Sequence, residues 1–226
     1  MSLPILDSSA SLPEVATWMR AVGKALPPHD GFLYFNALYL SVTERVIAKV
    51  AAGDVNDPVF VSRLDVVFAR TYQDALIAHE DEVARAWRPL REKRFQCDKS
   101  AFRFALAGMN AHINRDLVSA LLTTAAELGD DLETGTERHH DYQAVDDLLF
   151  ELMADAKQAL FDQLGEAIDE ALGPVDDLLE SFSIRTARSA AWTNAQIALA
   201  LPGPLRDLHL AAIDRHTGYA GRLILL

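Results

Sequence analysis

One stretch of the sequence, residues 100–128, constrains the fold more than any other. On a helix that turns by about 100° per residue, its apolar side chains occupy nearly the whole circumference, among them Phe104, Leu106, Ala111, Ile113, Leu117, Val118 and Leu122. A helix that is apolar nearly all round is stable in water only when other helices surround it. We therefore predict that residues 100–128 form the central, buried helix of a bundle.

The rest of the chain also carries helix signals. We expect helices over residues 12–24, 32–52, 58–79, 80–87 and 140–172, with two or three more after Pro174. Ser11 and Glu14 have the spacing of a capping box, and Asp57-Pro58 pairs a capping aspartate with a proline in the first turn. No alternating apolar run is bounded by turn residues, so nothing indicates a strand. The prediction is an all-α fold, a single domain over residues 1–226 with about eight helices.

Composition narrows the class of protein. The chain has 226 residues, is 50% hydrophobic and carries a net charge of −12. This charge disfavours binding to nucleic acid or to an anionic membrane surface, and no apolar run is long enough to span a bilayer. The single cysteine, Cys97, allows neither an intramolecular disulfide nor a multi-cysteine metal site, and no secretory signal precedes the first helix. We expect a cytoplasmic protein.

The middle of the central helix is unusually polar. His112 and Asp116 lie four residues apart on one face, beside small residues such as Gly108. Small residues there indicate either a closely packed neighbouring helix or room for a small molecule. Because buried polar groups need partners, other helices must supply some. We expect the candidate site residues to converge on one pocket: Asn36, Asp65, Tyr72, His112, Asn114 and Asp116.

Three interpretations of this cluster stay open. In the first, His112 is the acid–base group of a small-molecule enzyme, a cyclase, lyase or hydrolase, and Asp116 orients it. Asn36 and Asn114 would then position a substrate oxygen. In the second, the chain is a non-catalytic ligand-binding or scaffold protein whose polar network only fixes the helix register. The third is a metal-dependent oxygenase or hydrolase, whose divalent ion would be bound by His112, Asp116, His140 and Asp141.

Two of these expectations are geometric. His112 and Asp116 should both be largely buried and joined by a hydrogen bond, directly or through one partner. Asp65 lies on a stripe of apolar side chains, so it should be buried and paired, with Arg115, His112 or a tyrosine hydroxyl as the partner.

The sequence also resembles a known family. The block FALAGMNAHINRDL, residues 104–117, carries most of the likeness, and shorter pieces lie at residues 32–39, 63–68, 86–90 and 190–192. Together they resemble an uncharacterised, largely actinobacterial family filed as a domain of unknown function. The resemblance implies no activity. It implies that five matching positions belong to the family's pattern: Asn36, Asp65, His112, Asn114 and Asp116. It also implies a bacterial, cytosolic setting for the protein, in specialised metabolism.

Overall fold

The computed structural model describes residues 3–96, 101–149 and 183–226, and over these ranges it contains helices and no strand. The all-α prediction is therefore confirmed. The helices are α1 (Leu12–Ala25), α2 (Gly31–Ala52), α3 (Pro58–Ile77), α4 (Arg88–Lys93), α5 (Ala101–Ala111), the π-helix η1 (His112–Asp116), α6 (Leu117–Leu128), α9 (Ile184–Ala200) and α10 (Gly203–Ile224). None of these helices is long and apolar enough to cross a membrane.

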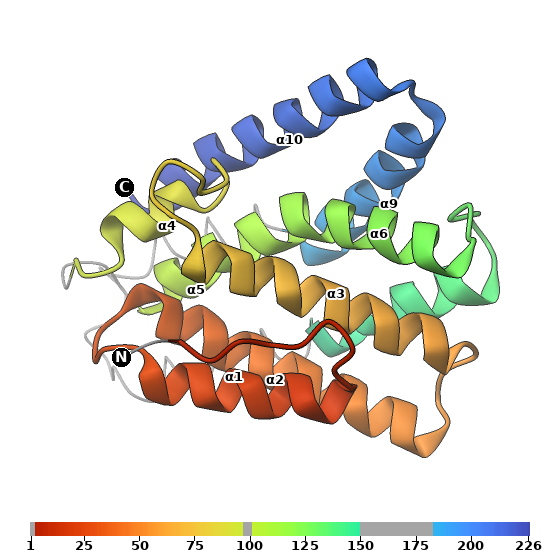
Figure 1. Cartoon of the computed structure of the whole chain (residues 1–226), viewed down its shortest axis with the longest axis horizontal. Coiled ribbons are helices and arrows are strands. Elements are labelled where there is room, and N and C mark those ends of the chain that lie inside the picture. The colour runs from red at the N-terminus through yellow and green to blue at the C-terminus, as the bar shows by residue number, and fades with distance from the viewer. Residues whose placement is uncertain (1–2, 97–100, 150–182) are drawn as a thin grey trace.

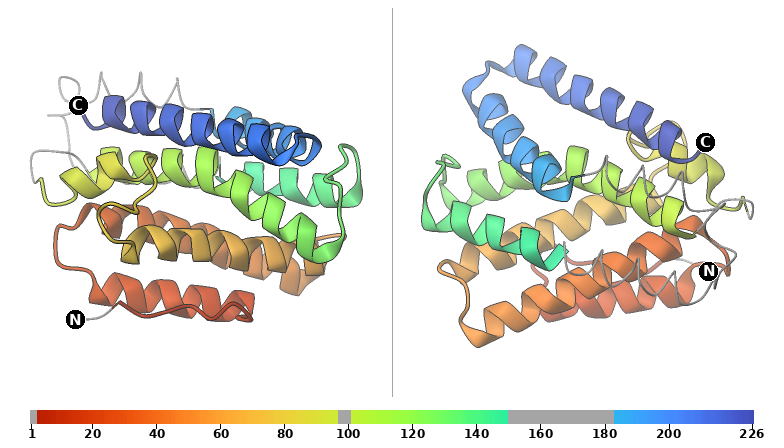
Figure 2. Two further views of the ribbon diagram at one scale, coloured as in Figure 1. Left: turned by 45° about the horizontal axis from the view of Figure 1, so that its top comes forward. Right: turned by 180° about the vertical axis from the view of Figure 1, so that it is seen from behind.

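The helix predicted to be the central one does lie in the middle of the bundle. It consists of α5, η1 and α6 in succession, and it contacts α2, α3, α9 and α10 (Figure 1). α1 packs against α2 on the far side from α10, so the helices lie in layers with the α5–η1–α6 segment between them (Figure 2). One cluster of buried apolar side chains includes residues from α1 through to α10. The surrounding helices remove the apolar circumference of the central helix from water.

The caps predicted from the sequence begin the outer helices where expected. The Glu14 carboxylate accepts a hydrogen bond from the Ser11 backbone N–H at 2.7 Å, as a capping box requires. Asp57 accepts from the backbone N–H groups of Val59 and Phe60, and Pro58 begins α3. These local bonds satisfy backbone donors that have no partner within the helix.

The prediction of a helix over residues 80–87 is wrong. These residues form turns, and the short helix α4 begins after them at Arg88. Pro89 lies in the first turn of α4, where proline is well tolerated, so it marks a helix start rather than a helix end. The backbone N–H groups of Arg85 and Ala86 donate to the side chain of Asp214 in α10, at 3.1 and 3.0 Å. A carboxylate from a distant helix therefore replaces the expected helical carbonyls as their acceptor.

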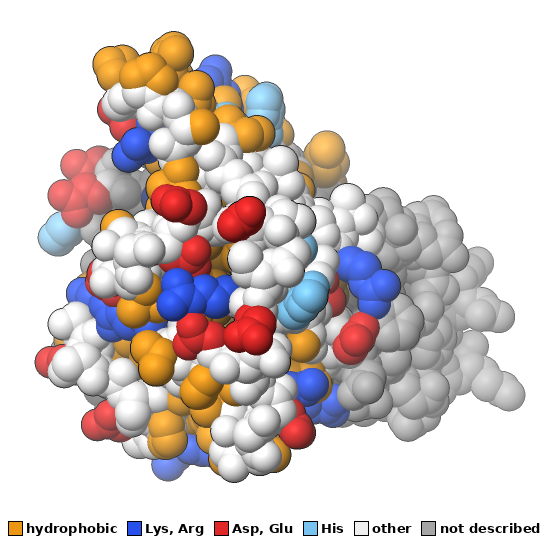
Figure 3. Space-filling model, turned by 90° about the vertical axis from the view of Figure 1, so that its right-hand side faces the viewer, with side chains coloured by type: hydrophobic (Ala, Val, Ile, Leu, Met, Phe, Trp, Pro, Cys, Tyr) orange, Lys and Arg blue, Asp and Glu red, His pale blue; other side chains and the backbone are white. Residues whose placement is uncertain are grey.

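Residues 137–149 are helical and lie on the side turned away from the viewer in Figure 1. The right-hand view of Figure 2 brings them to the front, near the beginning of α9. They are the described part of the helix expected over 140–172; the remainder, like Cys97 and Pro174, lies outside the described residues. Arg138 joins this segment to Asp57 and Asp130 by ion pairs of 2.7 and 3.0 Å. Acidic and basic side chains are interspersed at this end of the molecule (Figure 3).

Candidate functional site

The candidate site begins with a change of helix type. Residues His112–Asp116 form one π-helical turn, and the backbone N–H of Leu117 donates to the carbonyl of His112, five residues back. A π-turn holds one residue more than the α-helical ladder allows, and such turns are frequent at functional sites. Here the turn coincides with the polar stretch of the central helix, between the apolar α5 and α6.

His112 and Asp116 form a buried pair, as predicted. The Nδ1 atom of His112 lies 3.1 Å from Oδ2 of Asp116, and their side chains are 2% and 0% exposed. Asp116 accepts two further hydrogen bonds, from Trp87 Nε1 at 2.9 Å and from Arg115 at 2.7 Å. Burial by itself would raise the pKa of Asp116, but the bond from His112 and the charge of Arg115 outweigh burial and lower this pKa. Asp116 is therefore ionised.

The ionisation of Asp116 fixes the tautomer of His112. Burial lowers the pKa of the imidazole, and the bond to Asp116 opposes this only in part. The ring is therefore neutral at pH 7 and has one N–H. An ionised carboxylate can only accept, so that proton is on Nδ1. The other nitrogen, Nε2, has a free lone pair; it is buried and has no hydrogen-bond partner among the described residues.

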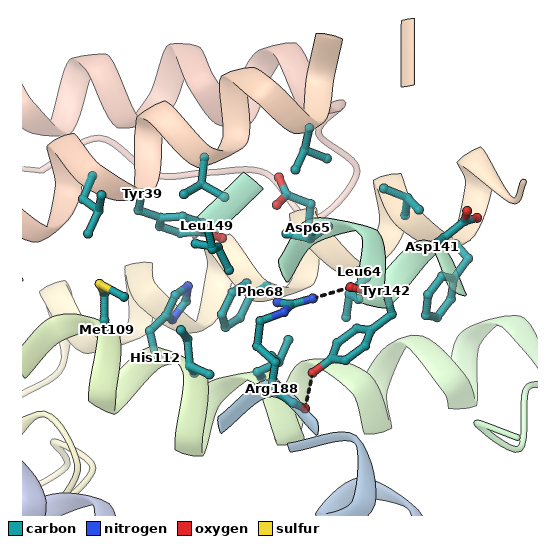
Figure 4. A pocket seen from close by; sticks show the side chains of 18 of the residues that line it. Tyr39, Leu64, Asp65, Phe68, Met109, His112, Asp141, Tyr142, Leu149 and Arg188 are labelled. Carbon is teal, nitrogen blue, oxygen red and sulfur yellow. Dashed lines mark hydrogen bonds between the residues drawn. The ribbon is translucent and has the colours of Figure 1, made fainter. Parts of the chain in front are cut away.

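The ring of His112 lies at the wall of a cavity of about 70 Å³. Phe68 stacks on the imidazole with 3.5 Å between ring centroids, and Tyr39 packs edge-on at 4.6 Å. Most of the lining is apolar, and the residues that line the cavity come from α2, α3, α5, η1, α6, α9 and the helical residues 137–149 (Figure 4). Two further polar atoms of lining residues, Tyr39 Oη and Asp65 Oδ2, are also buried and have no partner in the part of the chain that the structure describes.

Asp65 corrects one prediction. One of its oxygens is buried as expected, but that oxygen is paired with none of the partners proposed for it. Loss of hydration on burial raises the pKa of the Asp65 carboxyl to about 7, against the opposing charge of Arg188. Arg115, one of the expected partners, instead binds Asp116 and lies 3.9 Å from Asp214. Asp65 therefore shares one cavity with His112 without bonding to it.

Three of the other candidate residues lie outside the cavity wall. Asn36 donates to the carbonyl of Met19 and is reached by the Tyr72 hydroxyl at 3.5 Å, so both serve the packing of α1, α2 and α3. Asn114 donates to Asn110, which donates to the carbonyl of Thr217 in α10. The structure therefore places His112 and Asp65 on the cavity wall and bonds Asp116 to His112 without bringing it to the wall; it does not bring Asn36, Tyr72 or Asn114 there.

The residues proposed to bind a divalent metal do not come together. His140 is exposed, and Asp141 accepts from the side chain of Asn56 and the backbone N–H groups of Asn56 and Asp57. Within the described ranges no group of three or more His, Cys, Asp and Glu side chains could hold a metal ion. Figure 4 shows Asp141 and His112 at opposite ends of the group of residues that line the cavity.

Sequence reasoning missed Tyr39, Trp87 and Arg188. Tyr39 follows Asn36 by one turn on a buried stripe, where an aromatic residue indicates packing, and nothing local tells that its hydroxyl lacks a partner. Trp87 donates to Asp116 across 29 residues of sequence. Arg188 is 4% exposed, donates to Asp146 and to the carbonyl of Tyr142, and lies with its guanidinium 4.2 Å from the Tyr142 ring centroid.

These observations define an all-helical protein in which a buried histidine, bonded to an aspartate, borders a mainly apolar cavity. The chain belongs to DUF5995, a family of unknown function, whose model matches residues 12–226. The matched range includes η1 and every residue of the cavity wall. No curated protein and no solved structure matches the chain.

Proposed function

We propose that this protein is a small-molecule enzyme in which His112 is the general base. One observation carries the proposal: His112, a neutral and buried imidazole, borders a cavity, and its Nε2 atom has no partner among the residues described, while Nδ1 is bonded to an ionised aspartate. A carboxylate on Nδ1 orients the ring and stabilises the imidazolium that forms when Nε2 takes a proton. Asp116 would have this role, held in turn by Trp87 and Arg115.

The residues that line the cavity limit the types of reaction that His112 could catalyse. Its described residues include no serine, threonine, cysteine or lysine, the side chains that most often form covalent intermediates. His112 would therefore act by moving a proton. Lyase and cyclase reactions begin with such a step, and a hydrolase of this kind would use His112 to activate water. The ligand is a small molecule with an apolar body, because the wall is mainly apolar.

The proposal is tested with the variant His112→Gln, which keeps a polar side chain but removes the basic nitrogen. Wild type and variant are assayed on a panel of small esters, epoxides and carbonyl compounds, with proton exchange followed in D₂O. We expect the variant to lose turnover by about 10²- to 10⁴-fold, the usual contribution of a general base. His140→Gln changes an exposed histidine and should leave the rates unchanged. Equal rates in wild type and His112→Gln would exclude His112 as the base.

One observation favours a second candidate, a non-catalytic ligand-binding or scaffold protein. The cavity of about 70 Å³ is roughly half the ~150 Å³ of an engineered cavity that binds benzene, and binding pockets for drug-sized ligands are larger still. A cavity of this size holds a very small molecule or the reacting end of a larger one. Under the second candidate, ligands bind equally to wild type and His112→Gln, and no compound of the panel is turned over.

A further inference from the structure

We infer that Tyr39 and Asp65 bind one uncharged carbonyl oxygen, so that the substrate is a small, neutral and otherwise apolar ketone or aldehyde. This inference rests on the proposed function, since it names the substrate class for the site of His112. Tyr39 Oη and Asp65 Oδ2 both belong to residues of the cavity wall, and both are buried with no hydrogen-bond partner within residues 3–96, 101–149 and 183–226. Figure 4 shows the two side chains entering from α2 and α3 on the side of Leu149, above His112 and Phe68.

The energetic argument is that buried polar atoms seldom lack a partner. Leaving one unpaired costs about 1–3 kcal/mol, and native structures contain few of them. Among the described residues, three such atoms belong to the wall of this cavity, on His112, Tyr39 and Asp65. A carbonyl oxygen has two lone pairs, so it can accept from the Tyr39 hydroxyl and from a protonated Asp65 together. The rest of such a molecule would contact Phe68, Leu149 and the other apolar side chains of the wall.

The charges that face the cavity favour a neutral ligand. Besides Asp65 on α3, the titratable groups among the described residues of the wall are Tyr39 on α2, His112 on η1, Arg188 on α9, and Asp141 and Tyr142 on residues 137–149. A cation would be repelled by Arg188 and would lose its hydration among apolar side chains, and Asp65 would attract it only in the share of molecules in which this carboxyl is ionised. An anion would lose its hydration among apolar side chains, and Arg188 already donates to Asp146 and to the carbonyl of Tyr142. A neutral oxygen meets neither penalty.

Burial supports the donor role of both groups. It raises the pKa of Tyr39 well above its ordinary value, so the hydroxyl keeps its proton. The Asp65 carboxyl, with its pKa near 7, is protonated in a large share of molecules at neutral pH. A neutral carboxylic acid beside a tyrosine hydroxyl in an apolar site is an established arrangement for stabilising an oxyanion.

The arrangement assigns a role to each group in one balanced step. Nε2 of His112 takes a proton from the carbon next to the carbonyl, and the electron pair of that C–H bond moves to form an enolate. The negative charge develops on the oxygen bonded to Tyr39 and Asp65. Return of the proton from His112 restores the ketone, and in D₂O the returning proton is replaced by deuterium.

The experiment compares four probes of nearly equal shape: butanone, its alkene isostere 2-methyl-1-butene, propionate and the ammonium form of butan-2-amine. Binding to the full chain is measured by ligand-observed NMR at pH 6. We expect butanone to bind most tightly. Tyr39→Phe and Asp65→Leu should each weaken butanone binding by about 10-fold or more, because each removes one hydrogen bond in an apolar site.

Two matched variants complete the test. Thr43→Val removes another buried hydroxyl without a partner, on the same helix but outside the cavity wall, and should leave butanone binding unchanged. Asp65→Asn keeps a donor but has no titratable proton. Butanone binding to wild type should therefore weaken as the pH rises from 6 to 8, and binding to Asp65→Asn should not. This pH comparison stands even if Asp65→Leu fails to fold.

The outcomes separate this inference from the proposed function. Butanone that binds to wild type and to His112→Gln, without deuterium exchange in either, supports the Tyr39–Asp65 subsite and contradicts the role of His112 as a base. Tighter binding of propionate or of the ammonium ion overturns the inference, whatever the activity of His112. Failure of butanone to bind overturns it too, and the ester and epoxide panel still tests His112.

Discussion

At the scale of single residues, two buried tryptophans differ in the hydrogen bonding of the indole nitrogen. Trp87 and Trp192 are 1% and 2% exposed. Nε1 of Trp87 donates to Asp116 at 2.9 Å, whereas Nε1 of Trp192 has no partner among the described residues. The pair therefore provides a matched measurement of what the hydrogen bond to Asp116 contributes to folding.

The substitution Trp87→Phe should lower the free energy of unfolding by about 1.5–3 kcal/mol more than Trp192→Phe does. Both variants lose the same atoms, but only the first takes a donor from a buried, ionised carboxylate, a kind of bond worth about this much. Urea denaturation of the two variants and wild type gives the difference. Equal losses would mean that His112 and Arg115 alone satisfy Asp116.

Asp65 should make the protein less stable as the pH rises. Its folded-state pKa is about 7, above its ordinary value of 3.8, so the folded protein holds this proton more tightly than the unfolded chain. Below about pH 4 Asp65 is protonated in both the folded and the unfolded state, so its titration does not change the free energy of unfolding. Between the two pKa values stability falls with pH, and above them the loss is constant.

The substitution Asp65→Asn removes that dependence. The melting temperature of the variant, relative to wild type, should therefore rise from pH 4 to pH 7, by about 2–4 °C for each kcal/mol recovered. Sequence reasoning, which expected a paired carboxylate, implies the reverse sign. A relative melting temperature that falls over this pH range would show that Asp65 is paired after all, and one that does not change would show that folding leaves its pKa unaltered.

At the scale of elements, α5 lies against α2 at a glycine. A Cβ atom added to Gly108 would lie 2.4 Å from Cγ of Phe35, whose ring contacts His112 with 5.4 Å between centroids. The small residues beside the polar pair therefore serve close packing at this position. Gly203, at the start of α10, has no atom within 4 Å of such a Cβ.

The substitution Gly108→Ala should cost about 1–3 kcal/mol through overpacking, and Gly203→Ala should cost nothing measurable. Thermal or urea denaturation compares the two. Because Phe35 must move in the first variant, the NMR signals of the His112 ring should shift as well. A Gly108→Ala variant as stable as wild type, with unshifted signals, would show that α2 and α5 can separate freely.

The elements were predictable where their signals are local. Ser11 with Glu14 and Asp57 with Pro58 specify helix starts within four residues of sequence, so α1 and α3 begin where expected. The turns before Arg88 depend on Asp214, more than 100 residues away. The prediction of the central helix assumed one α-helical period over residues 100–128, and the π-turn interrupts that period. The partnerless hydroxyl of Tyr39 is a property of the packed bundle, and no local pattern reports it.

At the scale of the whole molecule, one ion pair joins the loop between α1 and α2 to the chain just after α4. Asp30 is 0% exposed and accepts from Arg94, while the Gly31 N–H donates to the Arg94 carbonyl at 2.6 Å. The guanidinium of Arg94 also lies 4.7 Å from the ring centroid of Phe32. This contact fixes the beginning of α2, and with it the helix that carries Tyr39.

The substitution Arg94→Met should lower the free energy of unfolding by about 3–5 kcal/mol, because it leaves a buried carboxylate without its charge partner. Arg20→Met breaks the pair with Glu44, whose side chains are about half exposed at 52% and 45%, and should cost less than about 1 kcal/mol. Chemical denaturation of both variants checks the contrast. A small loss for Arg94→Met would mean that Asp30 is held well enough by the Phe32 N–H, its other hydrogen bond.

The π-turn sets the rotational phase between the two ends of the central helix. α5 packs on α2 and α10, whereas α6 packs on α3 and α9. A chain one residue shorter in this turn would continue as an unbroken α-helix, and each residue of α6 would then face about 100° away from its present direction. The number of residues between α5 and α6 thus sets how far the contact face of α6 is rotated about the helix axis from that of α5. A homologous chain that lacked one of them would have to turn either half of its bundle to fit the other.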